Sequence, residues 1–119
     1  GKTLTLIEIN PKAGFYDYKN KYTDGNTNYT LPANIEAKVA NSLKDIALKC
    51  CELLRVRSYA RVDFMVDSQG NPYIMEVNTL PGFTPTSLVP KAAQHEGISF
   101  KDFVEYLLDT ATTDYENLK

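Results

Sequence analysis

The sequence contains no tryptophan, a single histidine and two cysteines among 119 residues. The cysteines, Cys50 and Cys51, are neighbours in a helical pattern, where adjacent side chains point about 100° apart and are poorly placed to bond to each other. We therefore expect reduced thiols and a cytoplasmic protein. A zinc site is not expected, because His95 lies far along the chain from both cysteines.

A large charge of one sign and a long apolar run are also missing. The formal net charge is only −2, so we expect no nucleic-acid partner. No apolar run is long enough to cross a bilayer, and no signal peptide is visible. The length and the 43% hydrophobic content suit one compact domain. The abrupt start at Gly1, without an initiator methionine, suggests a piece of a longer protein. Neither a P-loop nor a dinucleotide-binding fingerprint occurs, so these motifs do not predict nucleotide binding.

Residues 61–78 read as a hairpin that gathers polar side chains on one face. Because strand side chains alternate between faces, Arg61 and Asp63 share a face, as do Glu76 and Asn78. A turn at 68–71 places Asp63 opposite Glu76 and Arg61 opposite Asn78. Two facing carboxylates repel by up to about 1 kcal/mol. We therefore expect a cation between them.

The other hairpin face is predicted to be apolar and to meet a helix. It comprises Val62, Phe64, Val66, Tyr73, Met75 and Val77. The same register pairs Asp67 with Pro72.

The polar face offers oxygen ligands only, from Asp63, Glu76 and Asn78. Such a set suits Mg²⁺, Mn²⁺ or Ca²⁺ and does not suit Zn²⁺. Arg61 beside them could hold a phosphate with its bidentate fork. The alternative is an exposed hairpin in which Arg61 simply neutralises the two acids.

The rest of the chain predicts an α+β fold, a mostly antiparallel sheet with helices packed on one face. We expect a strand at Thr3–Ile9, then an irregular stretch at 10–31 that is either a lid or a surface excursion. An apolar stripe from Ile35 to Leu53 predicts a helix with Asn34 as its N-cap. Two helices should follow, one over 87–96 and one opened by a capping box of Ser99 and Asp102.

The loop after the second hairpin strand carries further candidates. Gly82 would let backbone N–H groups approach a ligand closely. Ser87, at a helix start, offers a hydroxyl and free N–H donors that suit a carboxylate. The alternative is a rigid turn followed by an ordinary serine N-cap.

Four stretches carry a family resemblance: Phe15–Tyr22, Arg61–Phe64, Met75–Pro85 and Ser87–Pro90. They resemble, in order, the D-alanine–D-alanine ligases, which are ATP-grasp enzymes of peptidoglycan synthesis. The resemblance covers only the C-terminal part of such a ligase. It implies that the N-terminal domain and most of the central domain are missing, and that residues 1–119 are the C-terminal portion of an ATP-grasp domain. Within it, the resemblance implies a mobile loop (10–31), a metal-binding hairpin (57–78) and an acceptor-binding loop (79–88).

The resemblance also implies roles around the phosphates of ATP. Asp63, Glu76 and Asn78 match the ligands of two Mg²⁺ (or Mn²⁺) ions. Arg61 matches the arginine that holds the transferring phosphate, and Lys21 matches a phosphate-facing lysine.

For the other substrate groups, Phe15 and Met75 would line the adenine pocket. Tyr22 would close over the first D-alanine, while Gly82 would stabilise an oxyanion through its N–H. The carboxylate of the second D-alanine would bind at a site formed by Ser87 and Leu88.

The reaction implied has two steps: ATP phosphorylates one D-alanine, and the amine of a second displaces the phosphate. Lys21–Tyr22 favours an amine acceptor. The resemblance further implies a homodimeric parent, and a fragment that is inactive alone. Two alternatives are a non-catalytic cation-binding or assembly module and another ATP-grasp carboxylate–amine ligase.

Overall fold

A computed structural model describes residues 1–11 and 27–112. The elements are β1 (Glu8–Pro11), β2 (Thr27–Thr30), α2 (Ala37–Leu53), β3 (Arg61–Val66), β4 (Pro72–Asn78), α3 (Leu88–His95) and α4 (Phe100–Thr110). The fold is α+β, as predicted. In the described residues the strands form two separate antiparallel pairs, β1–β2 and β3–β4, instead of one sheet. None of the described helices has the length and apolarity that crossing a membrane requires.

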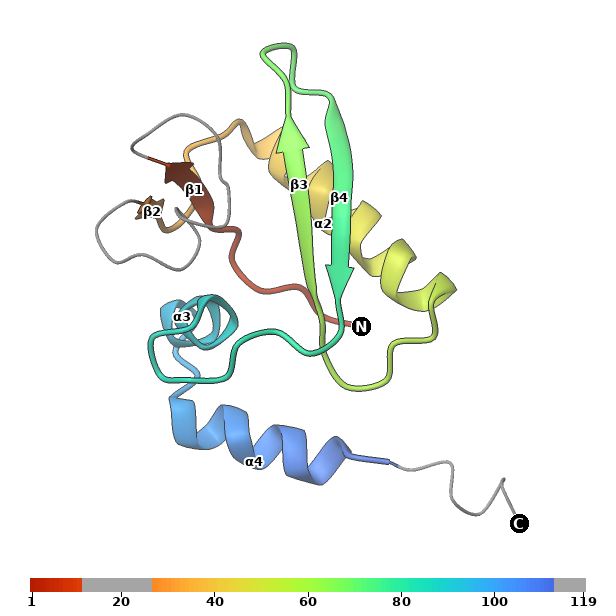
Figure 1. Ribbon diagram of the computed structural model, residues 1–119, viewed down its shortest axis with the longest axis vertical. Coiled ribbons are helices and arrows are strands. Elements are labelled where there is room, and N and C mark those ends of the chain that lie inside the picture. Colours follow the sequence, from red (N-terminus) through yellow and green to blue (C-terminus); the bar gives the residue numbers. More distant parts are fainter. Residues whose placement is uncertain (12–26, 113–119) are drawn as a thin grey trace.

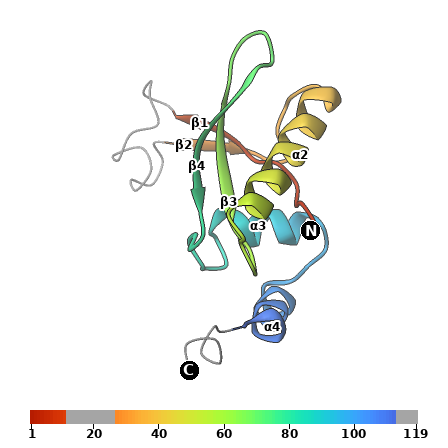
Figure 2. The same cartoon turned by 90° about the vertical axis from the view of Figure 1, so that its right-hand side faces the viewer.

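Helix α2 lies along one face of the β3–β4 pair (Figures 1 and 2). Its apolar stripe buries Leu43. The prediction of Asn34 as the N-cap is wrong, because the helix begins two residues later and its N-cap is Glu36, which makes no side-chain cap bond. Asn34 instead donates its backbone N–H to Oε2 of Glu8 at 3.1 Å, which ties the approach to α2 to strand β1.

The N-terminal segment differs from the predicted strand at 3–9, because the strand begins only at Glu8. Residues before it face the end of a helix: the Thr5 hydroxyl donates to Oε1 of Glu96 at 3.0 Å. One backbone bond, from the Ala33 N–H to the Leu6 carbonyl at 2.8 Å, also ties down this segment, but no ladder forms before Glu8.

Strands β1 and β2 extend into the stretch 10–31, which was expected to be irregular. Residues 10 and 11 belong to β1 and 27–30 form β2, so that expectation is wrong at both ends. Ile9 pairs with Tyr29 in this small antiparallel ladder. The central residues of the expected loop, 12–26, lie outside the described residues.

Helices α3 and α4 share the main buried core. Val89 and Ala93 of α3 pack against Phe103 of α4. The predicted capping box is confirmed in its first half, since the Ser99 hydroxyl accepts the Asp102 N–H at 3.1 Å. The helix predicted over 87–96 is α3.

An aromatic cluster fixes the loop between β4 and α3 onto this core. Phe83 of the loop lies 5.5 Å from Phe100 and 5.9 Å from Phe103, measured between ring centroids. Tyr59 meets Phe103 edge to face at 5.7 Å. The loop that carries Gly82 is therefore anchored to α4 through Phe83.

Candidate functional site

The β3–β4 pair brings the predicted polar residues to one face. Arg61 lies opposite Asn78 and Asp63 opposite Glu76, as the sequence predicted. The register then shifts, and Phe64 opposes Ile74. Two residues of β4 therefore oppose one of β3, which is a β-bulge.

The bulge corrects the predicted arrangement beyond Glu76. Tyr73 pairs with Met65, so it lies on the face of Asp63 and not on the apolar face. Met75 is the extra residue, and a bulge re-aims its side chain. Met75 is 63% exposed, so it was also wrongly placed against α2. The predicted pairing of Asp67 with Pro72 is off by one, because Val66 takes that place.

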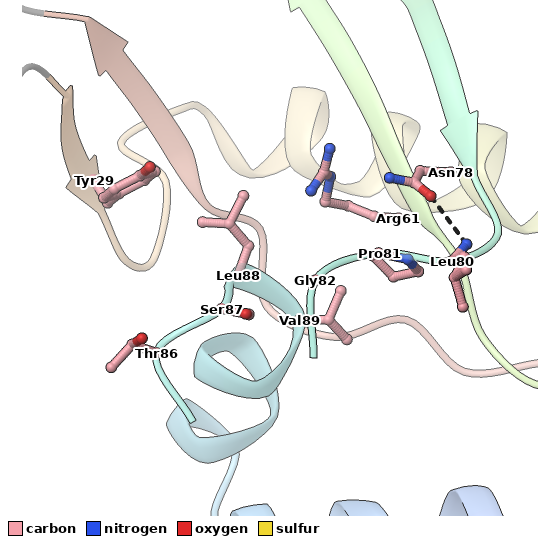
Figure 3. A pocket seen from close by; sticks show the side chains of 10 residues that line it. All are labelled: Tyr29, Arg61, Asn78, Leu80, Pro81, Gly82, Thr86, Ser87, Leu88 and Val89. Carbon is pink, nitrogen blue, oxygen red and sulfur yellow. Dashed lines mark hydrogen bonds between the residues drawn. The ribbon is translucent and has the colours of Figure 1, made fainter. Parts of the chain in front are cut away.

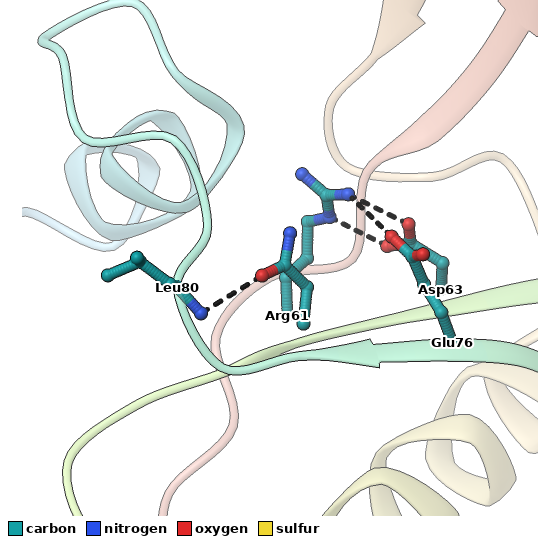
Figure 4. A network of polar contacts seen from close by, with 5 residues as sticks. Arg61, Asp63, Glu76 and Leu80 are labelled. Carbon is teal, nitrogen blue, oxygen red and sulfur yellow. Dashed lines mark hydrogen bonds and ion pairs between the residues drawn. The ribbon is translucent and has the colours of Figure 1, made fainter.

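Arg61 connects the two facing acids (Figure 4). Its Nε and Nη2 donate to the two carboxylate oxygens of Asp63 at 2.7 and 2.9 Å. Nη2 also lies 3.4 Å from Oε1 of Glu76. The side chains of Arg61 and Asp63 are only 18% and 25% exposed, so this charge pair is partly shielded from water. The Arg61 guanidinium thus contacts both acids, as in the alternative in which Arg61 neutralises them.

Asn78 turns the chain away from the hairpin. Its Oδ1 accepts the backbone N–H of Leu80 at 2.9 Å (Figure 3). A carbonyl oxygen has a second lone pair, so this bond leaves one acceptor position of Oδ1 for another ligand.

The donor set fits an oxygen-preferring divalent ion. Asp63 and Glu76 stand opposite each other, with Asn78 one alternation further along β4. No group of three or more His, Cys, Asp or Glu gathers within 1–11 and 27–112. Mg²⁺ needs few protein oxygens because water and phosphate complete its shell, whereas a structural zinc site needs four ligands.

An open cavity of about 370 Å³ adjoins this face (Figure 3). It lies between the end of the hairpin, the following loop, the start of α3 and strand β2. The lining residues are Tyr29, Arg61, Asn78, Leu80, Pro81, Gly82, Thr86, Ser87, Leu88 and Val89. The structure thus brings Arg61, Asn78, Gly82, Ser87 and Leu88, all predicted site residues, around one space.

The start of α3 presents hydrogen-bond donors to the cavity. Ser87 is the N-cap residue, but its hydroxyl makes no cap bond. Within the part of the chain that the structure describes, no intramolecular bond uses the N–H of Leu88 or Val89. Free N–H groups at a helix N-terminus favour a bound anion.

A family model described as D-ala D-ala ligase C-terminus matches residues 1–109. The chain belongs to this family. The D-alanine–D-alanine ligase of Pelotomaculum thermopropionicum is 50% identical over 108 residues, which cover 91% of this chain and 34% of that relative. D-alanine–D-alanine ligase B of Clostridium perfringens is 43% identical over 111 residues, or 93% of this chain and 36% of the relative. The chain thus spans about a third of the length of these ligases.

Solved ligase structures share the fold. The ligase of Bacillus anthracis complexed with ATP superposes with a TM-score of 0.74 at 39% identity, covering 90% of this chain and 35% of that one. The D-Ala:D-Ser ligase VanG of Enterococcus faecalis gives a TM-score of 0.72 at 30% identity. The match covers 90% of this chain and 31% of the VanG chain. The observed α+β fold is therefore the fold of the C-terminal part of these ligase structures.

Some predicted ligase residues lie outside this geometry. Phe15, Lys21 and Tyr22 fall among residues 12–26, which the structure does not describe.

Sequence reasoning gave no role to several residues beside the cavity. Tyr29 lines it, and Lys91 Nζ sits 5.2 Å from the Tyr29 ring centroid in a cation–π contact. Thr84 bonds to Ser87 from within the loop. Only Thr84 left a signal that could have been read, namely a second hydroxyl three residues before the helix start.

Proposed function

We propose that this chain carries the phosphate-binding and acceptor-binding half of the active site of a D-alanine–D-alanine ligase. Such an enzyme joins two D-alanines at the expense of ATP. Family membership supports the assignment, and one observation carries it: Arg61, Gly82 and Ser87 line a single cavity beside the Asp63–Glu76 pair.

On this proposal, Asp63, Glu76 and Asn78 hold Mg²⁺ or Mn²⁺, with two ions in the complete site. The bound metal supplies positive charge that neutralises phosphate oxygens. Arg61 turns its guanidinium from the two carboxylates toward the phosphate being transferred, where its planar fork matches two oxygens. Lys21 adds a second cation on the phosphates.

The cavity then receives the acceptor. The Ser87 hydroxyl and the Leu88 N–H bind the carboxylate of the second D-alanine, which directs its amine at the activated carboxyl of the first. The Gly82 N–H donates to the oxyanion that develops during this attack. A β-carbon at Gly82 would lie 3.1 Å from Ser87 Oγ, so glycine keeps this corner open.

Closure and nucleotide binding complete the proposal. Tyr22 covers the first D-alanine and excludes water from the acyl phosphate. Phe15 and Met75 line the adenine site, and the exposure of Met75 leaves it available for that contact. The two free cysteines suit a cytoplasmic enzyme, and the parent enzyme is expected to be a homodimer.

The test is D-alanine-dependent phosphate release from ATP by the full-length protein. We expect turnover that requires Mg²⁺, and loss of turnover in Arg61→Ala. Residues 1–119 alone should be inactive, because the remaining two thirds of the ligases they resemble are not there. A folded full-length protein that is inactive with D-alanine pairs would overturn the assignment.

A ligase with a D-serine acceptor is the second candidate, supported by the similarity to the D-Ala:D-Ser ligase. Competition between D-alanine and D-serine at equal concentration separates the two. Predominant formation of the D-alanine–D-alanine dipeptide is the result expected.

A further inference from the structure

The Ser87 hydroxyl is unusual for a helix start. An N-cap serine normally accepts the N–H of the second or third helical residue. The third residue of α3 is Pro90, which has no N–H. Ser87 makes no cap bond, so its hydroxyl is available for other contacts.

Thr84 contacts the Ser87 hydroxyl twice, through its backbone N–H and through its own hydroxyl. The Thr84 backbone N–H donates to Ser87 Oγ at 3.0 Å. The two hydroxyl oxygens lie 2.8 Å apart. The Ser87 N–H in turn donates to the Thr84 carbonyl at 3.0 Å. The three contacts fix Ser87 relative to the loop.

The donor count shows how the Ser87 hydroxyl can be left free to donate, since either hydroxyl of the Thr84–Ser87 pair can be the donor. A hydroxyl has one proton and two acceptor positions. The Thr84 N–H fills one acceptor position, and the Thr84 O–H can fill the other. Thr84 Oγ1 can itself accept from Thr86 Oγ1, which lies 3.4 Å away. When Thr84 is the donor of the hydroxyl pair, both acceptor positions of Ser87 Oγ are filled, and its own proton is left for another acceptor.

We propose that Thr84 is a positioning residue that holds the Ser87 hydroxyl as a donor toward the acceptor carboxylate. The inference rests on the proposed function. A carboxylate only accepts hydrogen bonds, so it needs a donor that is not spent elsewhere. Thr84 does not line the cavity, whereas Ser87 does. Its effect therefore passes through Ser87, and a chain of aligned hydroxyls strengthens the terminal bond.

The experiment compares Thr84→Val and Thr84→Ser in the full-length protein. Valine keeps the shape and the backbone N–H but removes the O–H, and serine restores the O–H. We expect the KM for the acceptor D-alanine to rise about three- to tenfold in Thr84→Val, the scale of one hydrogen bond. The KM for ATP and kcat should stay within about twofold. Thr84→Ser should resemble the wild type.

Two further variants separate positioning from folding. Thr110→Val makes the same change on α4, where the hydroxyl donates to the Tyr106 carbonyl at 2.8 Å, and should leave the acceptor KM unchanged. Thr84→Val combined with Ser87→Ala should be no worse than Ser87→Ala alone. Because Thr84 is exposed, valine should be accommodated. Thr84→Ala serves the same purpose if valine prevents folding.

The outcomes are distinct. An active wild type with an unchanged acceptor KM in Thr84→Val overturns the positioning role alone. So does a parallel rise in the KM for ATP, or a failure of serine to restore the acceptor KM. A wild type without D-alanine-dependent turnover overturns the proposed function, and the positioning role with it.

Discussion

Arg61 binds Asp63 through two hydrogen bonds, Nε to Oδ1 at 2.7 Å and Nη2 to Oδ2 at 2.9 Å. The same Nη2 reaches Glu76 at 3.4 Å. Two acids that face each other across a hairpin would repel without a cation. On the proposed function, a metal ion at these carboxylates shares their oxygens with the arginine, so we expect metal binding to weaken the Arg61 contacts.

Arg61→Ala should destabilise the metal-free protein. The loss removes charge-assisted bonds from a partly shielded pair and leaves two acids facing, which we expect to cost about 1–2 kcal/mol. Mg²⁺ should recover part of that loss, because it takes over the neutralisation. Urea unfolding in EDTA and in Mg²⁺ measures both values. An equal free energy of unfolding for wild type and variant in EDTA would contradict the argument.

Glu76→Gln should leave the metal-free stability within about 0.5 kcal/mol of the wild type. Repulsion between Asp63 and Glu76 taken alone would make this change stabilising. The contact with Arg61 offsets that repulsion, and Glu76 is 49% exposed in its side chain. On the proposed function Glu76 is an anionic metal ligand, so Mg²⁺ affinity should nevertheless fall at least about tenfold.

Asp63→Asn is the matched comparison, because Asp63 takes the two short bonds of the fork. Asp63→Asn should lower the free energy of unfolding in EDTA by about 1–2 kcal/mol, and Glu76→Gln should not. Thermal melts and magnesium titrations on both variants decide this. If Asp63→Asn and Glu76→Gln destabilise the protein equally, Arg61 does not bind Asp63 more strongly than Glu76.

Phe83→Ala should loosen the loop that carries Gly82. Phe83 lies against Phe100 and Phe103 but is 41% exposed, so we expect a loss of about 1–2 kcal/mol, below that of a fully buried phenylalanine. Leu108→Ala is the control, because Leu108 on α4 is 71% exposed and should change stability by less than about 0.5 kcal/mol. Similar losses for the two variants would mean that the aromatic cluster does not anchor the loop.

The sequence predicted the β3–β4 register correctly at Asp63 and Glu76 and wrongly between these residues and the turn. Asp63 and Glu76 oppose each other as expected. Asp67, however, accepts the N–H groups of Gln69 and Asn71, both at 2.9 Å, and so leaves the ladder for a longer turn. The bulge at Met75 compensates for that extra residue. Alternation alone could not show either feature, because each depends on a local side-chain bond or an insertion.

The cavity shows a different limit of sequence reasoning. Motif resemblance named Arg61, Gly82 and Ser87, which do meet around one space. It gave no role to Tyr29 or Phe83, whose positions follow from packing between segments far apart in the chain. Such contacts have no local pattern, so only the folded arrangement reveals them.

Asp67 should make stability fall in acid. The side-chain amide of Asn71 and then its backbone N–H lower the pKa of Asp67 below its ordinary 3.8, with smaller help from Gln69 and Tyr73. A carboxyl whose pKa is lower in the folded state stabilises the fold above its unfolded pKa and stops doing so as pH falls through the folded pKa. Asp67→Asn should therefore be less stable than the wild type at pH 6. The difference should shrink steadily once the pH drops below about 4.

Melts of both proteins between pH 6 and pH 3 test the Asp67 prediction. Tyr73→Phe serves as a mild control, because its hydroxyl contact to Asp67 is long, at 3.4 Å. A difference between Asp67→Asn and the wild type that stays constant across this range would contradict the linkage.

Gly70 and Gly97 allow backbone strain to be separated from steric contact. Both have φ of +84°, so alanine at either position should cost about 1–2 kcal/mol. A β-carbon at Gly70 would also lie 3.1 Å from Cγ2 of Val39 on α2, whereas at Gly97 it would meet nothing within 4 Å. Gly70→Ala should therefore lose more stability than Gly97→Ala in urea unfolding. Adding Val39→Ala should remove the extra loss of stability at Gly70 without changing the loss at Gly97, because Val39 lies next to the β-carbon position of Gly70 and not to that of Gly97. Equal losses for the two glycine variants would mean that the turn can move away from α2.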